Sequence, residues 1–576
     1  MRTYNFILQV KICFGLLVTI LILAACGGTG QDEGSLSGIS YDFSGRIIDG
    51  DVAGALVFID SNNNGTRDAW EACAFTDNDG YFSYNPATKT NYCSIDAAVQ
   101  QRQYCLITPT NFDELVLRAD GGYDAVTNEA FLGQMSRRVK VTPGKDRGAL
   151  IISPLTTLLT SARDENSQTT LLNALDLGKD DLDTDYLNTD GSGSINPKLL
   201  NKAIKIHKIN TVLSDSLTDA YPEIGDNTGT PNDASSIVYS NLAQEMISSG
   251  ADLDNVLSSP QVFSDVLEKS ENTLKNIYNE KSYTLPETLS DNAAEVSRIT
   301  NIVTSIPKIT DKLIDPNAES FGLQDAKGST RALESLIIKT VNESENESKD
   351  ESIDNALEFF SDDQNSELIT ALTESLSSDR ADLSALKDND FSGDDFDSVE
   401  EINNASTLPS DVAPFNQVGG LMIRISEMNF GRSPDKLRDI EAEFYFNGTA
   451  DASEGALTAC MKYIKDANAN GQLGEGNDLG HLVTGTWSKL EPNPATGDFY
   501  RLLALVNYLG DTYLASMKQI GNEVINGVPQ KKLLFDNGDK VKVAYSQNGF
   551  HESAFSIPTT HKQCRLRLPL RVDIAL

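Results

Sequence analysis

The sequence predicts a multidomain α+β protein with a β domain first, an α-helical domain in the middle and an antiparallel β-sandwich or barrel at the end. Residues 41–147 combine alternating apolar positions with Gly- and Asp-rich turns. From 150 to 340 the apolar residues recur every three or four positions, and the last part of the chain carries hairpin signals. A chain of 576 residues exceeds what one core accommodates. The expected segments are 1–25, a signal peptide; 26–40, a tether; 41–147, the β domain; 148–342, the helical domain; 343–410, an acidic segment and linker; and 411–576, the C-terminal β domain.

The N-terminus has the pattern of an export signal. Arg2 and Lys11 precede an apolar run of about 13 residues, which is too short to span a bilayer. The run ends in Leu23-Ala24-Ala25-Cys26, which resembles the signal of bacterial lipoproteins. The resemblance implies cleavage before Cys26 and acylation of that cysteine, with palmitate among the chains, so that the protein is anchored without spanning the membrane. An ordinary signal peptide with a chance cysteine is the alternative.

The residue after the cysteine bears on the compartment. Gly27 stands where lipoproteins retained in the inner membrane carry an aspartate. The resemblance therefore implies the outer membrane of a Gram-negative cell, and it leaves open whether the protein faces the periplasm or the exterior. The Gly- and Ser-rich residues 27–40 predict a flexible tether.

The charge is strongly acidic. Residues 1–25 contain two positive and no negative charges, so their removal takes the net charge from −37 to −39. This balance excludes nucleic acid and anionic lipid surfaces as partners. Acidity of this kind most often keeps an exported protein soluble, and it also suits divalent cations as ligands.

The cysteines predict disulfides. Five of the seven lie beyond Cys13 and Cys26, and an exported chain with so few cysteines is expected to pair most of them. Their positions favour the pair Cys460–Cys564, together with one pair among Cys73, Cys93 and Cys105. One thiol would then remain.

The central region has helical periodicity. A stripe of apolar residues spaced by three or four predicts one face of a helix, and a second stripe does the same further on. The stripes are Leu199, Ala203, Ile206, Ile209, Leu213 and Leu217, and then Val296, Ile299, Val303 and Ile306. Prolines at 197, 231, 260, 286 and 307 are expected to mark helix starts or connections. His207 lies beside the first stripe, and we interpret it as a structural histidine.

The region that follows is acidic. Residues 343–404 contain 20 Asp or Glu against three Lys or Arg. Apolar residues from 357 to 376 permit short amphipathic helices, whereas 388–401 is too highly charged to pack and predicts a linker.

The C-terminal part returns to strands. Lys531–Phe535 and Lys540–Tyr545 flank an Asn-Gly turn, which tolerates the positive φ of a two-residue hairpin. Phe499–Tyr508 and Thr512–Gln519 predict a second hairpin, and further apolar stretches, one of them at Arg565, bring the total to about nine strands.

A calcium-loop pattern follows a predicted strand at 55–59. In the twelve residues Asp60 to Glu71, oxygen-bearing residues occupy positions 1, 3, 5, 7, 9 and 12, with Gly65 at position 6 for the sharp turn. These residues are Asp60, Asn62, Asn64, Thr66, Asp68 and Glu71. Alternate side chains can thus converge on one Ca²⁺, with Thr66 giving its backbone carbonyl and Asp68 acting directly or through water. The alternative is an Asn- and Gly-rich turn whose side chains bond their own backbone.

The strands around this loop distinguish it from a helix–loop–helix calcium site. Together with the turn Thr76-Asp77-Asn78-Asp79-Gly80, the pattern of residues 43–85 resembles the B-type repeats of Gram-positive adhesins and carboxypeptidase-regulatory-like domains. That resemblance implies an Ig- or prealbumin-like β-sandwich in which calcium stabilises an edge. Only residues 72–75 separate the loop from the Thr-Asp turn, fewer than is usual in those domains, so the strand order stays open.

A second, weaker loop pattern lies in the C-terminal domain. Asp466, Asn468 and Asn470 leave a predicted strand in the same alternation, but position 12 is Asn477. Calcium binding and a plain turn are equally compatible with this stretch.

The order of anchor, tether, calcium-looped domain, helices and C-terminal strands resembles a loosely defined group of large lipoproteins of Gram-negative bacteria. The sequence carries no recognised catalytic motif. We therefore expect a non-enzymatic protein for attachment, scaffolding or the binding of an extracellular polymer or surface protein. The alternative is a polymer-acting hydrolase that uses carboxylates of the C-terminal domain, such as Glu475 and Asp478.

Overall fold

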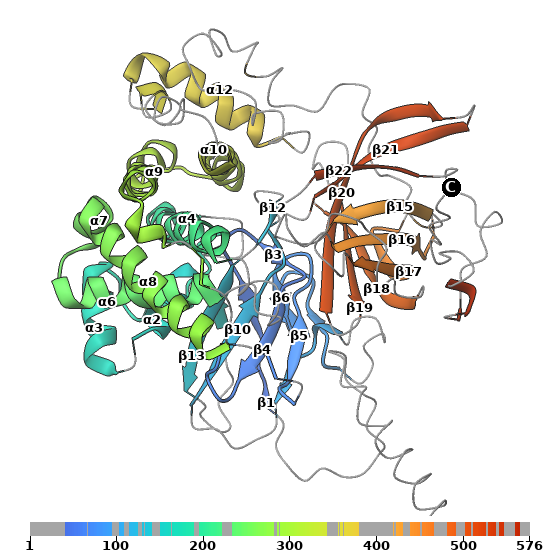
Figure 1. Cartoon of the computed structure of the whole chain (residues 1–576), viewed down its shortest axis with the longest axis horizontal. Helices are drawn as coiled ribbons and strands as arrows, with labels where there is room; N and C mark the ends of the chain where they lie inside the picture. Colours follow the sequence, from blue (N-terminus) through green and yellow to red (C-terminus); the bar gives the residue numbers. More distant parts are fainter. Residues whose placement is uncertain are drawn as a thin grey trace, which may run out of the picture.

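The computed structural model has a mixed α+β architecture in which strands, helices and strands follow one another along the chain (Figure 1). It describes most of residues 41–378 and, beyond them, chiefly the strands between 422 and 546 and a short turn around Cys564. The segments outside the described residues are chiefly 1–40, 95–102, 109–113, 125–128, 141–149, 189–194, 222–232, 343–354, 379–401, 403–418, 430–437, 466–480, 491–500, 547–558 and 565–576, together with Thr66 and Ala69.

The N-terminal part consists of several small sheets. Their strands are β1 (Tyr41–Asp42), β2 (Gly45–Ile47), β3 (Val52–Ala53), β4 (Leu56–Asp60), β5 (Cys73–Phe75), β6 (Tyr81–Phe82), β7 (Tyr84–Asn85), β8 (Thr90–Asn91), β9 (Ile107–Thr108), β10 (Glu114–Asp120), β11 (Tyr123–Asp124), β12 (Glu129–Ala130), β13 (Gln134–Lys140) and β14 (Leu150–Ile152). The order β13-β10-β4-β5 forms an antiparallel sheet, and in the sheet β14-β2-β6 the pair β14–β2 is parallel. Apolar side chains from both sheets share one core, which gives a sandwich-like arrangement.

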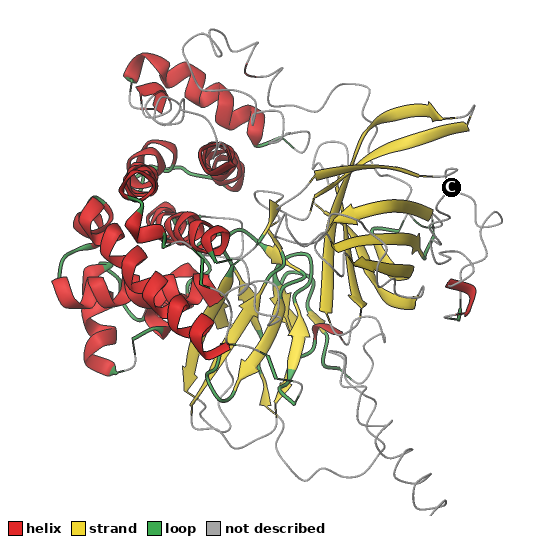
Figure 2. Cartoon of the chain, in the orientation of Figure 1, coloured by secondary structure: helices red, strands yellow, loops and turns green. Residues whose placement is uncertain are grey.

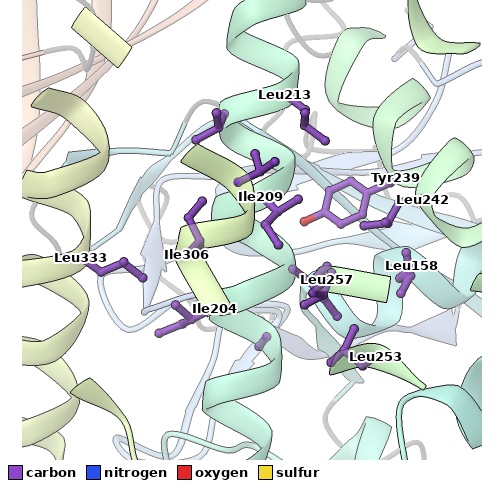
Figure 3. Packing of buried hydrophobic residues seen from close by; sticks show 14 of the residues in the cluster. Leu158, Ile204, Ile209, Leu213, Tyr239, Leu242, Leu253, Leu257, Ile306 and Leu333 are labelled. Atoms are coloured by element: carbon purple, nitrogen blue, oxygen red, sulfur yellow. The ribbon is translucent and has the colours of Figure 1, made fainter. Parts of the chain in front are cut away.

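The central part is helical, as expected (Figure 2). Its elements are α2 (Pro154–Thr160), α3 (Glu165–Ala174), η2 (Asp180–Asp183), α4 (Pro197–Ala220), α6 (Asp233–Ser249), α7 (Leu253–Leu257), α8 (Pro260–Lys281), η3 (Leu289–Asp291), α9 (Ala293–Leu313), α10 (Leu323–Asn342), η4 (Asp363–Asn365) and α12 (Ser366–Leu376). The predicted stripe on α4 is entirely buried, and Figure 3 shows Ile204, Ile209 and Leu213 of this helix among Tyr239, Leu257 and Ile306 of its neighbours. No helix in the described part of the chain is long and apolar enough to cross a membrane.

One expectation for this region needs correction. Pro307 does not end a helix, because α9 runs through it. Ile302, Ile306 and Ile309 are buried on either side of the proline, and their burial offsets the cost of the lost backbone hydrogen bond. The prediction of a short amphipathic helix within residues 357–376 is confirmed by α12, which lies against α10 with Leu372 and Leu376 buried.

Helix α2 connects the sheets to the helical part through its threonines. Thr156 Oγ1 donates to the carbonyl of Ser136 at 2.9 Å, and Thr157 Oγ1 accepts from the Ser136 N–H at 2.8 Å. Thr160 Oγ1 accepts from the Arg138 N–H at 3.1 Å. These hydroxyls satisfy the backbone of β13, which in the described part of the chain pairs with a strand on its β10 side alone.

Buried polar pairs also connect the sheets to the helical part. Arg46 of β2 forms an ion pair with Asp185, which follows η2. His207 of α4 places Nε2 at 3.0 Å from Oδ2 of Asp49, and Phe131 stacks on the imidazole. His207 is therefore a buried residue of the interface between the sheets and the helices.

The C-terminal part is an antiparallel sheet that curls into a barrel. Its strands, in chain order, are β15 (Met422–Asn429), β16 (Arg438–Phe446), β17 (Glu454–Lys465), β18 (His481–Leu490), β19 (Arg501–Tyr508), β20 (Asp511–Ile525), β21 (Val528–Asp536) and β22 (Val541–Ser546). Arg424 of β15 lies opposite Tyr545 of β22, which closes the barrel. The predicted hairpins are β19–β20 and β21–β22, and the expected strand at Arg565 lies outside the described residues.

Candidate functional site

The loop from Asp60 to Glu71 connects two neighbouring antiparallel strands. Strand β4 ends at Asp60 and β5 begins at Cys73, and Phe58 pairs with Cys73 across the hairpin. The loop therefore leaves a strand and enters a strand, as the sequence predicts.

Asp60 organises the first half of the loop. Its carboxylate is buried and accepts hydrogen bonds from the N–H groups of Asn64 at 3.0 Å and Gly65 at 2.9 Å. Asn63 and Gly65 have φ values of +54° and +82°. Such angles favour Asn and Gly, so the residue types at these positions form the tight turn around the Asp60 carboxylate.

Glu71 holds the base of the loop. Its carboxylate accepts from the N–H of Ser61 at 2.7 Å and from the N–H of Asp68 at 3.0 Å, and its own N–H donates to the Asp68 carbonyl at 3.0 Å. The last residue of the loop is thereby bound to the second and the ninth. These bonds fix the loop ends next to each other.

Asp68 draws the two asparagines inward. Its Oδ2 accepts from Nδ2 of Asn62 at 2.8 Å and from Nδ2 of Asn64 at 3.3 Å. The oxygen and nitrogen of an amide exchange places when it rotates by half a turn, so each asparagine can present an oxygen at the same point. Asp60, Asn62, Asn64 and Asp68 thus supply oxygens within one small loop, a donor set that suits Ca²⁺.

The loop does not form a metal site from acidic side chains alone. Among the described residues no three His, Cys, Asp or Glu side chains form a group that could hold a metal by themselves. Glu71 uses its oxygens on backbone N–H groups, so closing a calcium site requires this carboxylate to change partners. Thr66 lies outside the described residues, as do Asp466, Asn468 and Asn470 of the second loop and the lipidation residue Cys26.

An arginine that sequence analysis missed contacts the loop. Arg118 of β10 forms an ion pair with Asp60 through Nε, and its Nη2 donates to Oδ1 of Asn63 at 3.1 Å. Its Nη1 donates to Oε1 of Gln134 at 2.9 Å. Arg118 is far from the loop in sequence, and only the pairing of β10 with β4 brings it there.

The Thr-Asp turn after β5 is a second polar cluster. Thr76 Oγ1 donates to the Val52 carbonyl at 2.6 Å and accepts from the Ala55 N–H at 2.9 Å. Asp77 accepts from Nδ2 of Asn85 at 2.8 Å and from the hydroxyl of Tyr92 at 2.5 Å. Burial raises the pKa of Asp77 to about 6. This turn attaches the segments after β5 to the sheets.

The cysteines are paired largely as predicted. Cys460 and Cys564 form a disulfide, and Cys93 pairs with Cys105. The expectation of a leftover thiol is wrong for Cys73, because that residue is itself disulfide-bonded. A sequence shows how many cysteines there are, but not which ones the fold brings together.

Comparisons with known proteins gave no match. The chain matches no protein-family model. No curated protein and no solved structure matches it either.

Proposed function

We propose that this chain is a non-enzymatic, lipid-anchored protein of the outer membrane, with a calcium-stabilised Ig- or prealbumin-like N-terminal module. Its role is attachment, scaffolding or the binding of an extracellular polymer or surface protein. The observation that carries the proposal is a hairpin loop in which Asp68 bonds the amides of Asn62 and Asn64, Asp60 bonds the Asn64 N–H and Glu71 binds the base. These residues would hold the ion, and the ion would supply a charge that cross-links the loop to the sheet.

The disulfides and the acidic composition are consistent with this role. Pairs such as Cys93–Cys105 and Cys460–Cys564 persist in oxidising compartments. A net charge of −37 keeps the chain away from anionic surfaces and favours divalent cations. Calcium at millimolar concentration outside the cell suffices for a loop of this composition, for which we expect a Kd of ~10⁻⁴–10⁻³ M.

The chain contains a built-in reporter of the loop. Trp70 lies between Asp68 and Glu71 and is 67% exposed, whereas the only other tryptophan, Trp487, is buried in the barrel at 1%. A fluorescence change on calcium addition should therefore come from Trp70, and it should disappear in Trp70→Phe. Ten millimolar calcium should also raise the melting temperature of the mature chain, by the equivalent of about 1.4 kcal/mol for a Kd of ~10⁻³ M.

Glu71→Gln should abolish both responses. Glu165→Gln is the matched control, because Glu165 is a highly exposed glutamate on α3, and its responses should equal those of the wild-type chain. A mature chain whose fluorescence and melting temperature stay constant up to 10 mM calcium would remove calcium from the proposal.

The anchor and the partner need separate experiments. Cells fed a palmitate analogue should label the wild-type chain but not Cys26→Ser, and labelling that persists in the variant would exclude the anchor. Protease treatment of intact cells decides which face of the membrane carries the protein. Crosslinking on living cells, followed by identification of the captured molecule, tests attachment or scaffolding directly.

A further inference from the structure

We propose that Arg118 is an internal cation that competes with calcium for Asp60 and thereby sets the calcium affinity of the loop. This inference rests on the proposed function and concerns the regulation of the same site. The side chain of Asp60 is completely buried, and the side chain of Arg118 is 12% exposed.

A buried carboxylate requires a counter-charge. Leaving an ionised Asp without a partner in the interior costs several kcal/mol. The N–H groups of Asn64 and Gly65 donate to Asp60 but carry no net charge. In the absence of metal, Arg118 supplies the positive charge, so the loop keeps its shape without an ion.

The same arginine opposes the metal. A guanidinium on Asp60 and a divalent cation bound by Asp60 would stand within a few ångströms of each other, beside a carboxylate that is itself buried. At such distances the repulsion between a single and a double positive charge amounts to several kcal/mol even at an effective dielectric constant of 20. Calcium must therefore displace the guanidinium from Asp60 or bind against its repulsion.

The structure provides other partners for Arg118. Its Nη1 bonds Gln134 and its Nη2 bonds Asn63, so the side chain stays anchored when Nε leaves Asp60. Gln134 in turn donates to the Gly65 carbonyl at 2.9 Å and accepts from Oγ of Ser236 on α6 at 3.1 Å. A shift of Arg118 therefore acts on a residue that joins the loop to the helical part.

The test compares Arg118→Gln and Arg118→Lys in the full mature chain. Removing the charge should tighten calcium binding about tenfold or more, as measured by calorimetry and Trp70 fluorescence. It should also lower the melting temperature in a chelator and enlarge the shift that calcium produces. Lysine keeps the charge, so the affinity of Arg118→Lys should stay within about threefold of wild type. Arg298→Gln is the control, since it removes an arginine that pairs with Glu295 on α9, away from the loop.

The outcomes separate this inference from the proposed function. If the wild-type chain binds calcium and Arg118→Gln binds no more tightly, Arg118 is not a competitor, although the calcium site stands. If only Arg118→Gln binds calcium, the arginine has replaced the metal in the natural chain, which supports the inference and removes calcium from the proposed function. If neither binds, both fall.

A second measurement applies even if Arg118→Gln folds only with calcium. The Nε–H of Arg118 should give a protected arginine signal in the nitrogen-15 NMR spectrum of the metal-free wild-type chain, assigned by its absence in Arg118→Lys. Calcium should shift this signal and speed its exchange with solvent. An unchanged signal at saturating calcium would overturn the competition.

Discussion

The hydroxyl of Tyr92 donates a 2.5 Å hydrogen bond to the carboxylate of Asp77, at the turn that follows the candidate calcium loop. Among the described residues, the hydrogen bonds to Asp77 come from the Tyr92 hydroxyl, the Asn85 amide and backbone N–H groups, and none of these donors is a cation. Burial dominates and raises the pKa of Asp77 from 3.8 to about 6. The native state thus binds a proton to Asp77 more tightly than the unfolded chain does.

This pKa gives a pH dependence with a definite sign. Between pH 4 and 6 the native Asp77 holds more proton than the unfolded chain, so its contribution to stability decreases as the pH rises through that window. A rise from 3.8 to about 6 corresponds to roughly 3 kcal/mol. The stability difference between wild type and Asp77→Asn, taken from urea unfolding, should therefore be larger at pH 4.5 than at pH 7.

Asp164→Asn provides the opposite case. Asp164 caps α3, and its hydrogen bonds with Ser167 lower its pKa. The stability difference between wild type and Asp164→Asn should shrink on acidification. A difference for Asp77→Asn that shrinks in the same way would contradict a raised pKa at Asp77.

Removing each of these two disulfides should lower the stability by a different amount. Cys460–Cys564 closes a loop with a sequence separation of 104 residues, whereas Cys93–Cys105 spans 12. The chain-entropy relation gives up to ~4.7 kcal/mol for a loop of about 100 residues and ~3 kcal/mol for a short one. The double variant Cys460→Ser/Cys564→Ser should lower the urea midpoint of the barrel, followed by Trp487 fluorescence in a Trp70→Phe background. An unchanged Trp487 transition would show that this bond does not stabilise the barrel.

Sequence patterns predicted the elements whose information is local. The stripe from Leu199 to Leu217 is one helix face, and the strands predicted on either side of Asn537-Gly538 pair with each other. The pairing of Cys460 with Cys564 was also predicted, because both are remote from the other cysteines. The loop spacing also predicted a compact turn, in which Asp68 bonds the amides of Asn62 and Asn64 and Asp60 bonds the Asn64 N–H.

The features that sequence analysis missed depend on contacts between distant residues. Arg118 reaches Asp60 across 58 positions because β10 pairs with β4. Nothing in the local pattern of Arg118 distinguishes it from a solvated strand residue. Likewise the sequence permits an amphipathic helix where α12 lies, but not the place where it packs, which depends on Gly328 of α10.

The glycine of α10 that contacts α12 is Gly328, and its substitution can be tested. A Cβ at Gly328 would lie 2.0 Å from the carbonyl oxygen of Thr373, so Gly328→Ala should prevent α12 from packing on α10. Backbone hydrogen exchange across 366–376 should then become much faster than in wild type. Gly322→Ala is the control, since its Cβ would meet only the side chain of Asp325 at 3.5 Å. Equal exchange rates in both variants would contradict the close contact.

Glu271 of α8 provides the last prediction. Its buried carboxylate accepts from the hydroxyl of Tyr221 at 2.8 Å, from the N–H of Ser290 at 3.0 Å, and from the Leu289 N–H and the Ser290 hydroxyl. Burial alone would raise the pKa of Glu271. The hydrogen bonds, above all the one from the Ser290 hydroxyl, outweigh this effect and lower the pKa. The charged carboxylate therefore holds the turn η3 against α8.

Glu271→Gln replaces one acceptor oxygen by a donor that faces other donors. We expect the free energy of unfolding at pH 7 to fall by ~2–4 kcal/mol, and Tyr221→Phe, which removes one donor, to cost ~1 kcal/mol. Because the native pKa of Glu271 is lowered, the contribution of the carboxylate is present above its unfolded pKa and is lost as the pH falls through the native value. The deficit of Glu271→Gln should accordingly diminish below about pH 4. Glu268→Gln is the control, because Glu268 is an exposed neighbour on the same helix, and its free energy of unfolding should equal that of wild type. If the loss of stability in Glu271→Gln persisted unchanged at pH 3, Glu271 would act through its shape and not through its charge.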